Sequence, residues 1–290
     1  MSTQETDASR GVGEQVVGDP KPLSREELLT RWEKAQYDGV VRYGAGSNTD
    51  KRGEFYKHGP GTRLVILGED VMDSCETPWA DATVEFAFEA IGRKTNIAFL
   101  ERGFGMGIVA SRAMEHLALR GGSYSCIELN NQVADYAENA WKPKQELRKE
   151  IAQSDMRANR PLSVEIKIIR GDAIRETQKL ARKEKKFDII ISDTYPLSKD
   201  EEGINDISDL ETIIGCLKPD GVFAFFGYHS GSEEDLDRTQ RELVYDRFDD
   251  IQIKHVSVLP PKSYRYLNTA KGAVTRLPII ICTRPIIQES

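Results

Sequence analysis

Four acidic residues stand at the ends of short apolar segments, where their side chains could do chemistry: Glu101, Glu128, Asp172 and Asp193. A carboxylate can accept hydrogen bonds from both hydroxyl groups of a ribose, and it can hold a cationic nucleophile and receive its proton. Ligands of an open α/β sheet bind outside the carboxyl ends of its parallel strands. If the apolar segments are such strands, we expect these acids to line one crevice.

A glycine-rich turn follows the first of these acids. An apolar run over residues 97–100 ends at Glu101, and Gly103, Gly105 and Gly107 come next, directly before an apolar helical pattern. Glycines let the backbone approach a ligand closely, and the first N–H groups of the following helix point at it. The pattern predicts a nucleotide-type cofactor site, and a tight turn without a ligand is the alternative.

The spacing of the glycines bears on which cofactor this is. The dinucleotide pattern is Gly-x-Gly-x-x-Gly, and here Ile108 occupies the position of its last glycine. The segment Glu-x-Gly-x-Gly that starts at Glu101 instead resembles motif I of the class I S-adenosylmethionine (SAM) methyltransferases. This segment therefore favours SAM over a dinucleotide.

The remaining acids have less specific surroundings. Glu128 lies some twenty residues beyond the glycines, where a ribose acceptor fits SAM and NAD equally. Asp172 could lie near an adenine or serve only in a turn. Asp193 opens the segment Asp-Thr-Tyr-Pro-Leu-Ser and should face the reactive end of a cofactor, with a turn or helix cap as the alternative. Glu76 taken alone looks like a helix-start acid, since Pro78 follows it.

Apolar segments and helical patterns alternate along the chain, which predicts an α/β fold of βαβ units. Strands are expected at residues 96–101, 123–128, 164–169, 187–192, 221–227, 251–257 and 278–283. Helices are expected at about residues 79–91, 106–119, 130–153, 173–185, 204–217 and 234–247. No helix separates the last two strands, so these should be antiparallel neighbours. The prediction is a doubly wound, Rossmann-like sheet of seven strands, mostly parallel with an antiparallel last strand.

The chain divides into three expected regions. Residues 1–22 are polar and should form a disordered tail. Residues 23–65 should form an N-terminal helix and lid region, with a capping box of Ser24 and Glu27 at the helix start and a loop or lid over residues 38–62. Residues 66–290 should form the methyltransferase domain.

The composition excludes several classes of protein. The 290 residues carry a net charge of −7 with a pI near 5.4, and no Lys- and Arg-rich block suggests a nucleic acid partner. The four cysteines show no spacing typical of zinc sites or a disulfide framework, which favours a reducing cytoplasm. Neither a signal peptide nor an apolar run of about 20 residues is apparent, so no membrane association is expected.

Five segments resemble guanidinoacetate N-methyltransferase, in the same order and at similar spacing over about residues 66–283. They are Val-Met-Asp-Ser-Cys-Glu-Thr-Pro-Trp from Val71, Glu-x-Gly-Phe-Gly-Met from Glu101, Asp-Thr-Tyr-Pro-Leu-Ser from Asp193, Leu-Lys-Pro-x-Gly from Leu217 and Pro-Pro-x-x-x-Arg-Tyr from Pro260. The resemblance implies a SAM-dependent N-methyltransferase that releases S-adenosylhomocysteine. No metal is implied.

The resemblance also implies roles for individual residues. Glu76 and Asp193 match the two acids that grip the guanidine in this family, with Asp193 as the expected proton acceptor and Met72 lining the site. Tyr228 and His229 are further expected substrate contacts. The expected cofactor contacts are Glu101, Gly103, Phe104, Gly105, Met106, Gly107, Ile108, Val109, Glu128, Leu129, Asn130, Asp172, Ala173 and Ile174.

The chain departs from the family near the expected substrate. Cys75 stands where the family has Trp, Gly107 replaces Ala, and Tyr228-His229 replaces a different pair. We therefore expect a small guanidino compound such as arginine, guanidinoacetate or a related guanidino acid. The alternatives are a methyltransferase of the same fold that acts on another amine or a heteroaromatic nitrogen, and a non-catalytic SAM-binding protein. A homodimer is compatible with the sequence.

Overall fold

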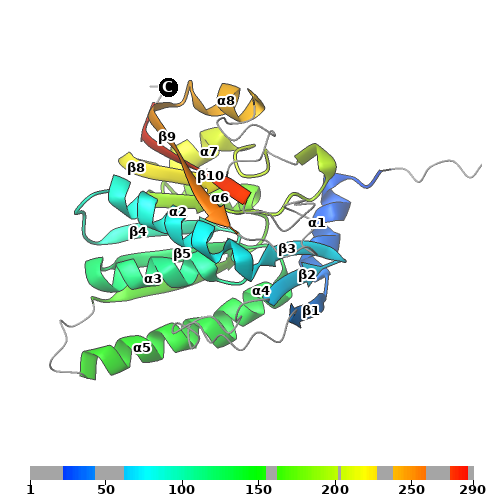
Figure 1. Ribbon diagram of the computed structural model, residues 1–290, viewed down its shortest axis with the longest axis horizontal. Coiled ribbons are helices and arrows are strands. Elements are labelled where there is room, and N and C mark those ends of the chain that lie inside the picture. Colours follow the sequence, from blue (N-terminus) through cyan, green and yellow to red (C-terminus); the bar gives the residue numbers. More distant parts are fainter. Residues whose placement is uncertain are drawn as a thin grey trace, which may run out of the picture.

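Seven strands form one sheet in the order β6-β5-β4-β7-β8-β10-β9, with helices packed against it (Figure 1). The computed structural model describes residues 22–42, 62–154, 162–201, 204–226, 238–258 and 275–286. The strands are β4 (Ile97–Arg102), β5 (Gly122–Glu128), β6 (Val164–Arg170), β7 (Phe187–Ser192), β8 (Leu217–Phe226), β9 (Phe248–Val258) and β10 (Thr275–Pro285). The predicted α/β fold class is confirmed.

Strand direction in this sheet matches the prediction as well. Strands β6, β5, β4, β7 and β8 pair in parallel, whereas β10 is antiparallel to both β8 and β9. The chain builds one half of the sheet outward from β4 through β5 to β6, and it then returns to add β7 on the other side of β4. This reversal of strand order is the switch point where α/β sheets bind ligands.

The central strands of the sheet are buried on both faces. Phe99 and Ile191 belong to one apolar core and Leu100 and Ile190 to the other, because successive side chains of a strand point to opposite faces. All six residues of β7 are buried, as expected for a central parallel strand. The helices are α2 (Thr77–Ala90), α3 (Ile108–Arg120), α4 (Asn131–Tyr136), α5 (Lys142–Ser154), α6 (Ala173–Arg182), α7 (Leu210–Cys216) and α8 (Arg238–Val244).

Two helices differ from the prediction in detail. The helix expected over residues 130–153 is interrupted between α4 and α5 by a π-helical segment, Ala137–Trp141. The helix expected over residues 204–217 begins only at Leu210, and residues 204–209 form turns. This second difference matters for the site, because the turns bring an acid to the cavity.

The N-terminal region contains a second, smaller sheet. Helix α1 (Arg25–Lys34) begins at the predicted capping box, and β1 (Tyr37–Arg42), β2 (Thr62–Ile66) and β3 (Glu69–Asp73) follow as antiparallel neighbours. Helix α1 and this sheet lie together on one side of the molecule (right in Figure 1). The expectation of a loop or lid over residues 38–62 was wrong for β1, and residues 43–61 lie outside the described part.

The hairpin between β2 and β3 had no recognisable turn signal. Its two turn residues, Leu67 and Gly68, have φ angles of 56° and 78°. Positive φ at both positions suits the twist of a two-residue hairpin, but Asn or Asp is the usual first residue. Because this position is a leucine, the sequence did not indicate a hairpin.

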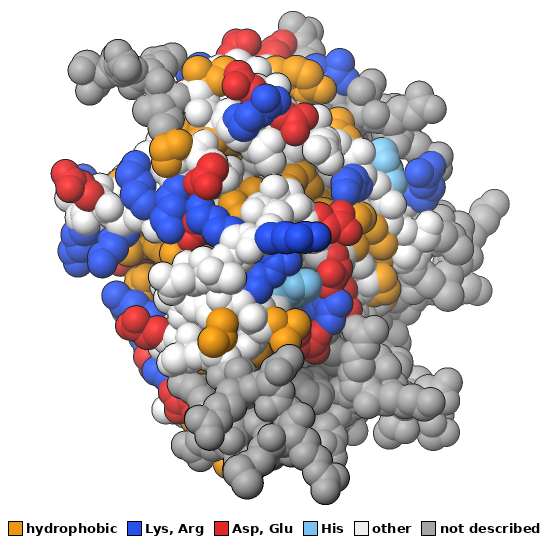
Figure 2. Space-filling view, turned by 90° about the vertical axis from the view of Figure 1, so that its left-hand side faces the viewer, with side chains coloured by type: hydrophobic (Ala, Val, Ile, Leu, Met, Phe, Trp, Pro, Cys, Tyr) orange, Lys and Arg blue, Asp and Glu red, His pale blue; other side chains and the backbone are white. Residues whose placement is uncertain are grey.

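The described surface carries mixed charges. Lys and Arg side chains lie among Asp and Glu side chains on the face seen in Figure 2. Three cysteines, Cys126, Cys216 and Cys282, are buried free thiols. No helix in the described ranges has the length and apolar character needed to cross a membrane.

Candidate active site

A cavity of about 340 Å³ is lined by residues at the carboxyl ends of the parallel strands, where β4 and β7 meet. This volume is within the range of small-molecule sites. Eleven of the predicted site residues line it: Met72, Glu76, Gly103, Gly105, Glu128, Leu129, Asn130, Asp172, Ala173, Ile174 and Asp193. The structure therefore brings both of the expected catalytic acids and much of the expected cofactor site to one cavity.

The glycine turn and the Asp193 backbone are in direct contact. Gly103 has a φ angle of 90°, and a Cβ atom added to it would lie 2.1 Å from the carbonyl oxygen of Asp193. The Asp193 N–H donates to the carbonyl oxygen of Arg102 at 2.9 Å. Only glycine fits at position 103, because the glycine turn lies directly against the backbone that carries Asp193.

Glu128 has the surroundings of a ribose acceptor. Its side chain is buried, and its two oxygens accept the N–H groups of Phe104 at 2.9 Å and Asn130 at 2.7 Å. Burial raises the pKa of Glu128, while these N–H groups act in the opposite direction. Carboxylate oxygens have further lone pairs, so Glu128 can still accept ribose hydroxyl groups from the cavity side.

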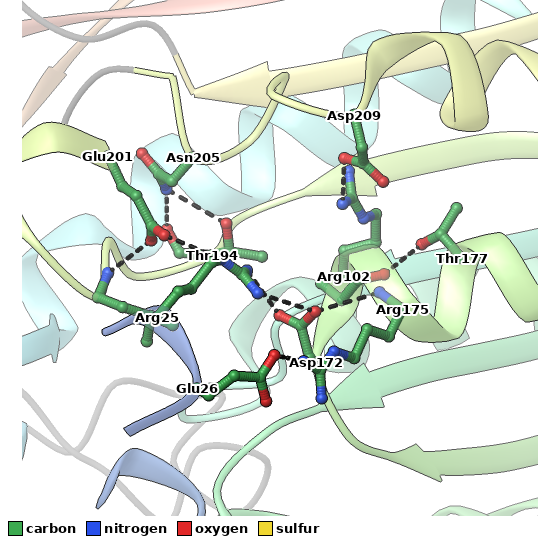
Figure 3. A network of polar contacts seen from close by, with 12 residues as sticks. Arg25, Glu26, Arg102, Asp172, Arg175, Thr177, Thr194, Glu201, Asn205 and Asp209 are labelled. Atoms are coloured by element: carbon green, nitrogen blue, oxygen red, sulfur yellow. Dashed lines mark hydrogen bonds and ion pairs between the residues drawn. The ribbon is translucent and has the colours of Figure 1, made fainter. Parts of the chain in front are cut away.

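Asp172 caps α6 and also binds a cation from the N-terminal helix. Its Oδ1 accepts the N–H of Arg175 at 3.1 Å, and its Oδ2 lies 3.0 Å from Nη2 of Arg25 (Figure 3). The Nε of Arg25 lies 3.1 Å from Oε1 of Glu201. Arg25 thus joins the segments after β6 and β7 across one end of the cavity. Sequence reasoning had not singled out this arginine.

Two aromatic side chains from different segments meet at the cavity. The rings of Trp32 in α1 and Tyr195 after β7 are 5.1 Å apart, and both line the cavity. The Nδ2 of Asn130 donates to the carbonyl oxygens of Trp32 and Ala35, each at 2.9 Å. Helix α1 is therefore attached directly to a predicted cofactor residue.

The two expected catalytic acids differ in their surroundings. Glu76 is buried, and its Oε1 accepts the N–H of Asp73 at 2.8 Å. Asp193 is only partly buried, and within the described residues its carboxylate accepts no hydrogen bond and forms no ion pair. Burial raises the pKa of Asp193 well above its usual range, and the nearby charges of Asp206, Glu76 and Glu101 raise it further. A cation bound between Asp193 and Glu76 would relieve this unfavourable charge.

A further acid, Asp206, supports the segment around Asp193. Its Oδ1 accepts the N–H and the hydroxyl group of Thr194, each at 2.8 Å, and the hydroxyl group of Ser192 at 3.1 Å. The fully buried Arg102 donates to the carbonyl oxygen of Asp206 at 3.2 Å. Its guanidinium also pairs with Asp209 at 2.6 Å (Figure 3). Asp206 was missed because its segment had the apolar pattern of a helix.

Several expected cofactor residues do not line the cavity. Glu101 is buried beneath it, where its carboxylate accepts a hydrogen bond from the hydroxyl group of Tyr124. The side chains of four others are packed in the apolar core: Phe104, Met106, Ile108 and Val109. Gly107, with a φ angle of 74°, caps α3. These residues shape the turn, and only their backbone groups could reach a ligand.

Only some of the residues that were predicted to contact the substrate lie in the described part of the chain. Met72 lines the cavity, with its sulfur atom 3.2 Å from the N–H of Met106. Tyr228 and His229 lie outside the described residues. The described lining as a whole suits SAM, because it offers a ribose acceptor at one end and acids that attract a sulfonium at the other.

Comparison with known proteins gives the same assignment. The model of the guanidinoacetate N-methyltransferase family matches residues 47–153, a segment that contains Glu76, the glycine turn and Glu128. The predicted resemblance is confirmed, and with it the assignment of the protein as a SAM-dependent methyltransferase. Asp193 lies beyond the matched residues.

Two solved structures show weak similarity to this chain. Spermidine synthase from Thermotoga maritima has a TM-score of 0.49 and 15% identity, covering 86% of this chain and 72% of that one. Human methyltransferase-like protein 13, in complex with SAH, has a TM-score of 0.42 and 14% identity, covering 72% of this chain and 81% of that one. Similarity at this level carries no conclusion about the substrate of this protein.

Proposed function

We propose that this SAM-dependent methyltransferase transfers the methyl group to a guanidino nitrogen of a small molecule. The observation that supports this most strongly is the position of Asp193, whose carboxylate has no hydrogen-bond partner in the described residues and lines the same cavity as Glu76. Two carboxylates can hold a planar guanidinium through charge-assisted hydrogen bonds. The positive charge of such a cation would offset the negative charges that raise the pKa of Asp193.

The chemistry of the guanidinium explains why two acids are needed. The pKa of a guanidinium lies far above neutral pH, so forming the neutral base at pH 7 would cost roughly 9 kcal/mol at 1.36 kcal/mol per pKa unit. A side chain could not remove the proton completely before the reaction. Glu76 would instead orient the guanidinium, and Asp193 would accept the proton from the reacting nitrogen as its bond to carbon forms.

The charges balance in this scheme. When bound, SAM supplies the methyl group from its sulfonium, and the electron pair of the broken C–S bond remains on sulfur. The guanidinium loses one proton to the Asp193 carboxylate, and its nitrogen lone pair forms the new N–C bond. The product is a methylguanidinium cation, so the positive charge lost from sulfur is offset by the proton that neutralises Asp193. Release of that proton to solvent completes the cycle.

The test is methyl transfer to a panel of guanidines and amines, with product masses as the readout. Glu76→Gln and Asp193→Asn should each lose at least about 100-fold in kcat, because each removes a charge that grips the cation in the transition state. SAM affinity, measured by calorimetry, should change little. The matched controls are the exposed acids Glu146→Gln and Asp249→Asn, which should retain full activity.

Two results would contradict the proposal. One is normal SAM binding with no methyl transfer to any guanidine. The other is methyl transfer only to a non-guanidine amine, which would assign the protein to the same fold with a different substrate class.

A further inference from the structure

The substrate end of the cavity has an extended apolar wall. Beyond Glu76 and Asp193, six described residues from the small sheet, α2, β8 and β10 line it with hydrocarbon or aromatic surface: Leu64, Ile66, Val71, Trp79, Phe226 and Leu277. The small sheet places three of them, because β2 and β3 pair antiparallel and both contribute to the wall. This surface lies next to the proposed guanidinium site, and neither the glycine turn nor Glu128 belongs to it.

Trp79 contributes no polar atom to this wall. Its indole N–H donates to the carbonyl oxygen of Pro278 at 3.1 Å, and its ring lies 3.9 Å from the ring of Phe226. The one hydrogen-bonding group of the indole is therefore already engaged. A substrate group in this part of the cavity would meet carbon atoms.

The charged residues that line the cavity also disfavour an anionic group on the substrate. Among the described residues that line the cavity, six are acids and one, Arg25, is a cation. Arg25 is held by Asp172 and Glu201 at the opposite, cofactor end. A carboxylate on the substrate would thus find no free cation in the described lining, and it would face Glu76 and Asp193 in a site of low dielectric constant.

We propose that the preferred substrate is a guanidine whose other end is an uncharged hydrocarbon group. This inference rests on the proposed function and narrows it, and it departs from the guanidino acids that the family resemblance implies. The guanidinium lies between Glu76 and Asp193, and the hydrocarbon group packs against Val71, Leu64 and Leu277. Burial of each methylene strengthens binding by about fourfold, from about 0.8 kcal/mol per methylene.

The test compares pairs of guanidines of matched shape that differ in one carboxylate. The full-length protein with SAM is assayed on n-butylguanidine against 4-guanidinobutyrate and on ethylguanidine against guanidinoacetate, with kcat/KM from product masses. We expect the uncharged member of each pair to be preferred by at least about tenfold, because the acidic site disfavours an anion. We also expect kcat/KM to rise with chain length from ethyl to butyl.

A variant of the wall makes the test specific. Val71→Thr has nearly the same shape but replaces one methyl group of the apolar surface with a hydroxyl group, so the ratio of kcat/KM for butylguanidine to that for ethylguanidine should fall about fivefold. A preference for guanidinoacetate or 4-guanidinobutyrate would overturn this inference and leave the proposed function intact. Absence of transfer to every guanidine, with SAM bound normally, would overturn both.

Discussion

Thr194 donates both its backbone N–H and its hydroxyl group to one oxygen of Asp206, each at 2.8 Å. The same oxygen accepts the hydroxyl group of Ser192 at 3.1 Å. Asp193 is the residue between these two donors, so Asp206 holds the chain on both sides of the proposed proton acceptor. The negative charge of Asp206 also raises the pKa of Asp193.

Replacing Asp206 should change the pH dependence of the reaction. Asp206→Asn retains an oxygen that can accept hydrogen bonds but removes the negative charge that raises the pKa of Asp193. The pKa of Asp193 should fall, so the acidic limb of the kcat/KM profile should move to lower pH. Burial and the charges of Glu76 and Glu101 remain, so the shift should be partial. An unmoved limb, with the Asp249→Asn control also unmoved, would show that Asp206 has only a structural role.

Asp193 itself should destabilise the protein in the absence of ligands. Its folded pKa lies above its unfolded value, so its contribution to stability is present at low pH and is lost as the pH rises through the folded pKa. At neutral pH, above the unfolded pKa of about 3.9, Asp193→Asn should increase the free energy of unfolding by about 1 kcal/mol, with no gain at a pH below the unfolded value. Urea unfolding of the wild type and of Asp193→Asn, at neutral and at low pH, measures the difference in the free energy of unfolding. Equal stability of the two proteins at neutral pH would contradict the proposed charge repulsion.

Glu128 should be required for cofactor affinity. Glu128→Gln puts an amide group where a carboxylate accepts the N–H groups of Phe104 and Asn130. Loss of charge-assisted hydrogen bonds typically costs about 1.5–3 kcal/mol, so the Kd for SAM should rise roughly 10- to 100-fold. Calorimetry with SAM and with S-adenosylhomocysteine measures both affinities. Unchanged binding would exclude Glu128 from the cofactor site.

The contact between Gly103 and Asp193 should make the turn intolerant of any side chain. Gly103→Ala combines a φ angle of 90° with a Cβ atom 2.1 Å from a carbonyl oxygen, so it should destabilise the protein by about 3 kcal/mol. The matched control is Gly215→Ala in α7, where nothing lies within 4 Å of the added atom. That variant should be neutral or stabilising by about 0.5–1 kcal/mol. Equal thermal stability of the two variants would contradict the close contact between Gly103 and the backbone of Asp193.

The parts of the fold that could be predicted depend on local patterns. Strand β7 was predictable because the largely apolar run over residues 187–191 ends at the polar residues Ser192 and Asp193, and α1 because Ser24 and Glu27 form a capping box. The convergence of Glu128 and Asp193 on one cavity then followed from the parallel sheet. Each of these inferences needed only the period of the apolar residues and the rule for strand ends.

The parts that could not be predicted depend on contacts between distant segments. Asp206 lies in a stretch with a helical apolar pattern, and only its hydrogen bonds to Ser192 and Thr194 reveal its role. Glu101 holds the motif position of a cofactor residue, yet its carboxylate is buried against the hydroxyl group of Tyr124. Arg25 is separated by 147 residues from its partner Asp172. Sequence spacing carries no signal for such pairs.

The central claim, that Asp193 and Glu76 together bind a guanidinium, can be tested without turnover. Binding of n-butylguanidinium to the protein saturated with S-adenosylhomocysteine should lower the pKa of Asp193 and release its proton. Calorimetry in two buffers of different ionisation enthalpy, repeated at several pH values, counts the released protons. We predict proton release at pH values between the pKa of Asp193 in the complex and its pKa in the free protein. Asp193→Asn should release no proton. Equal binding by wild type and Asp193→Asn, with no proton released at any pH, would contradict the account.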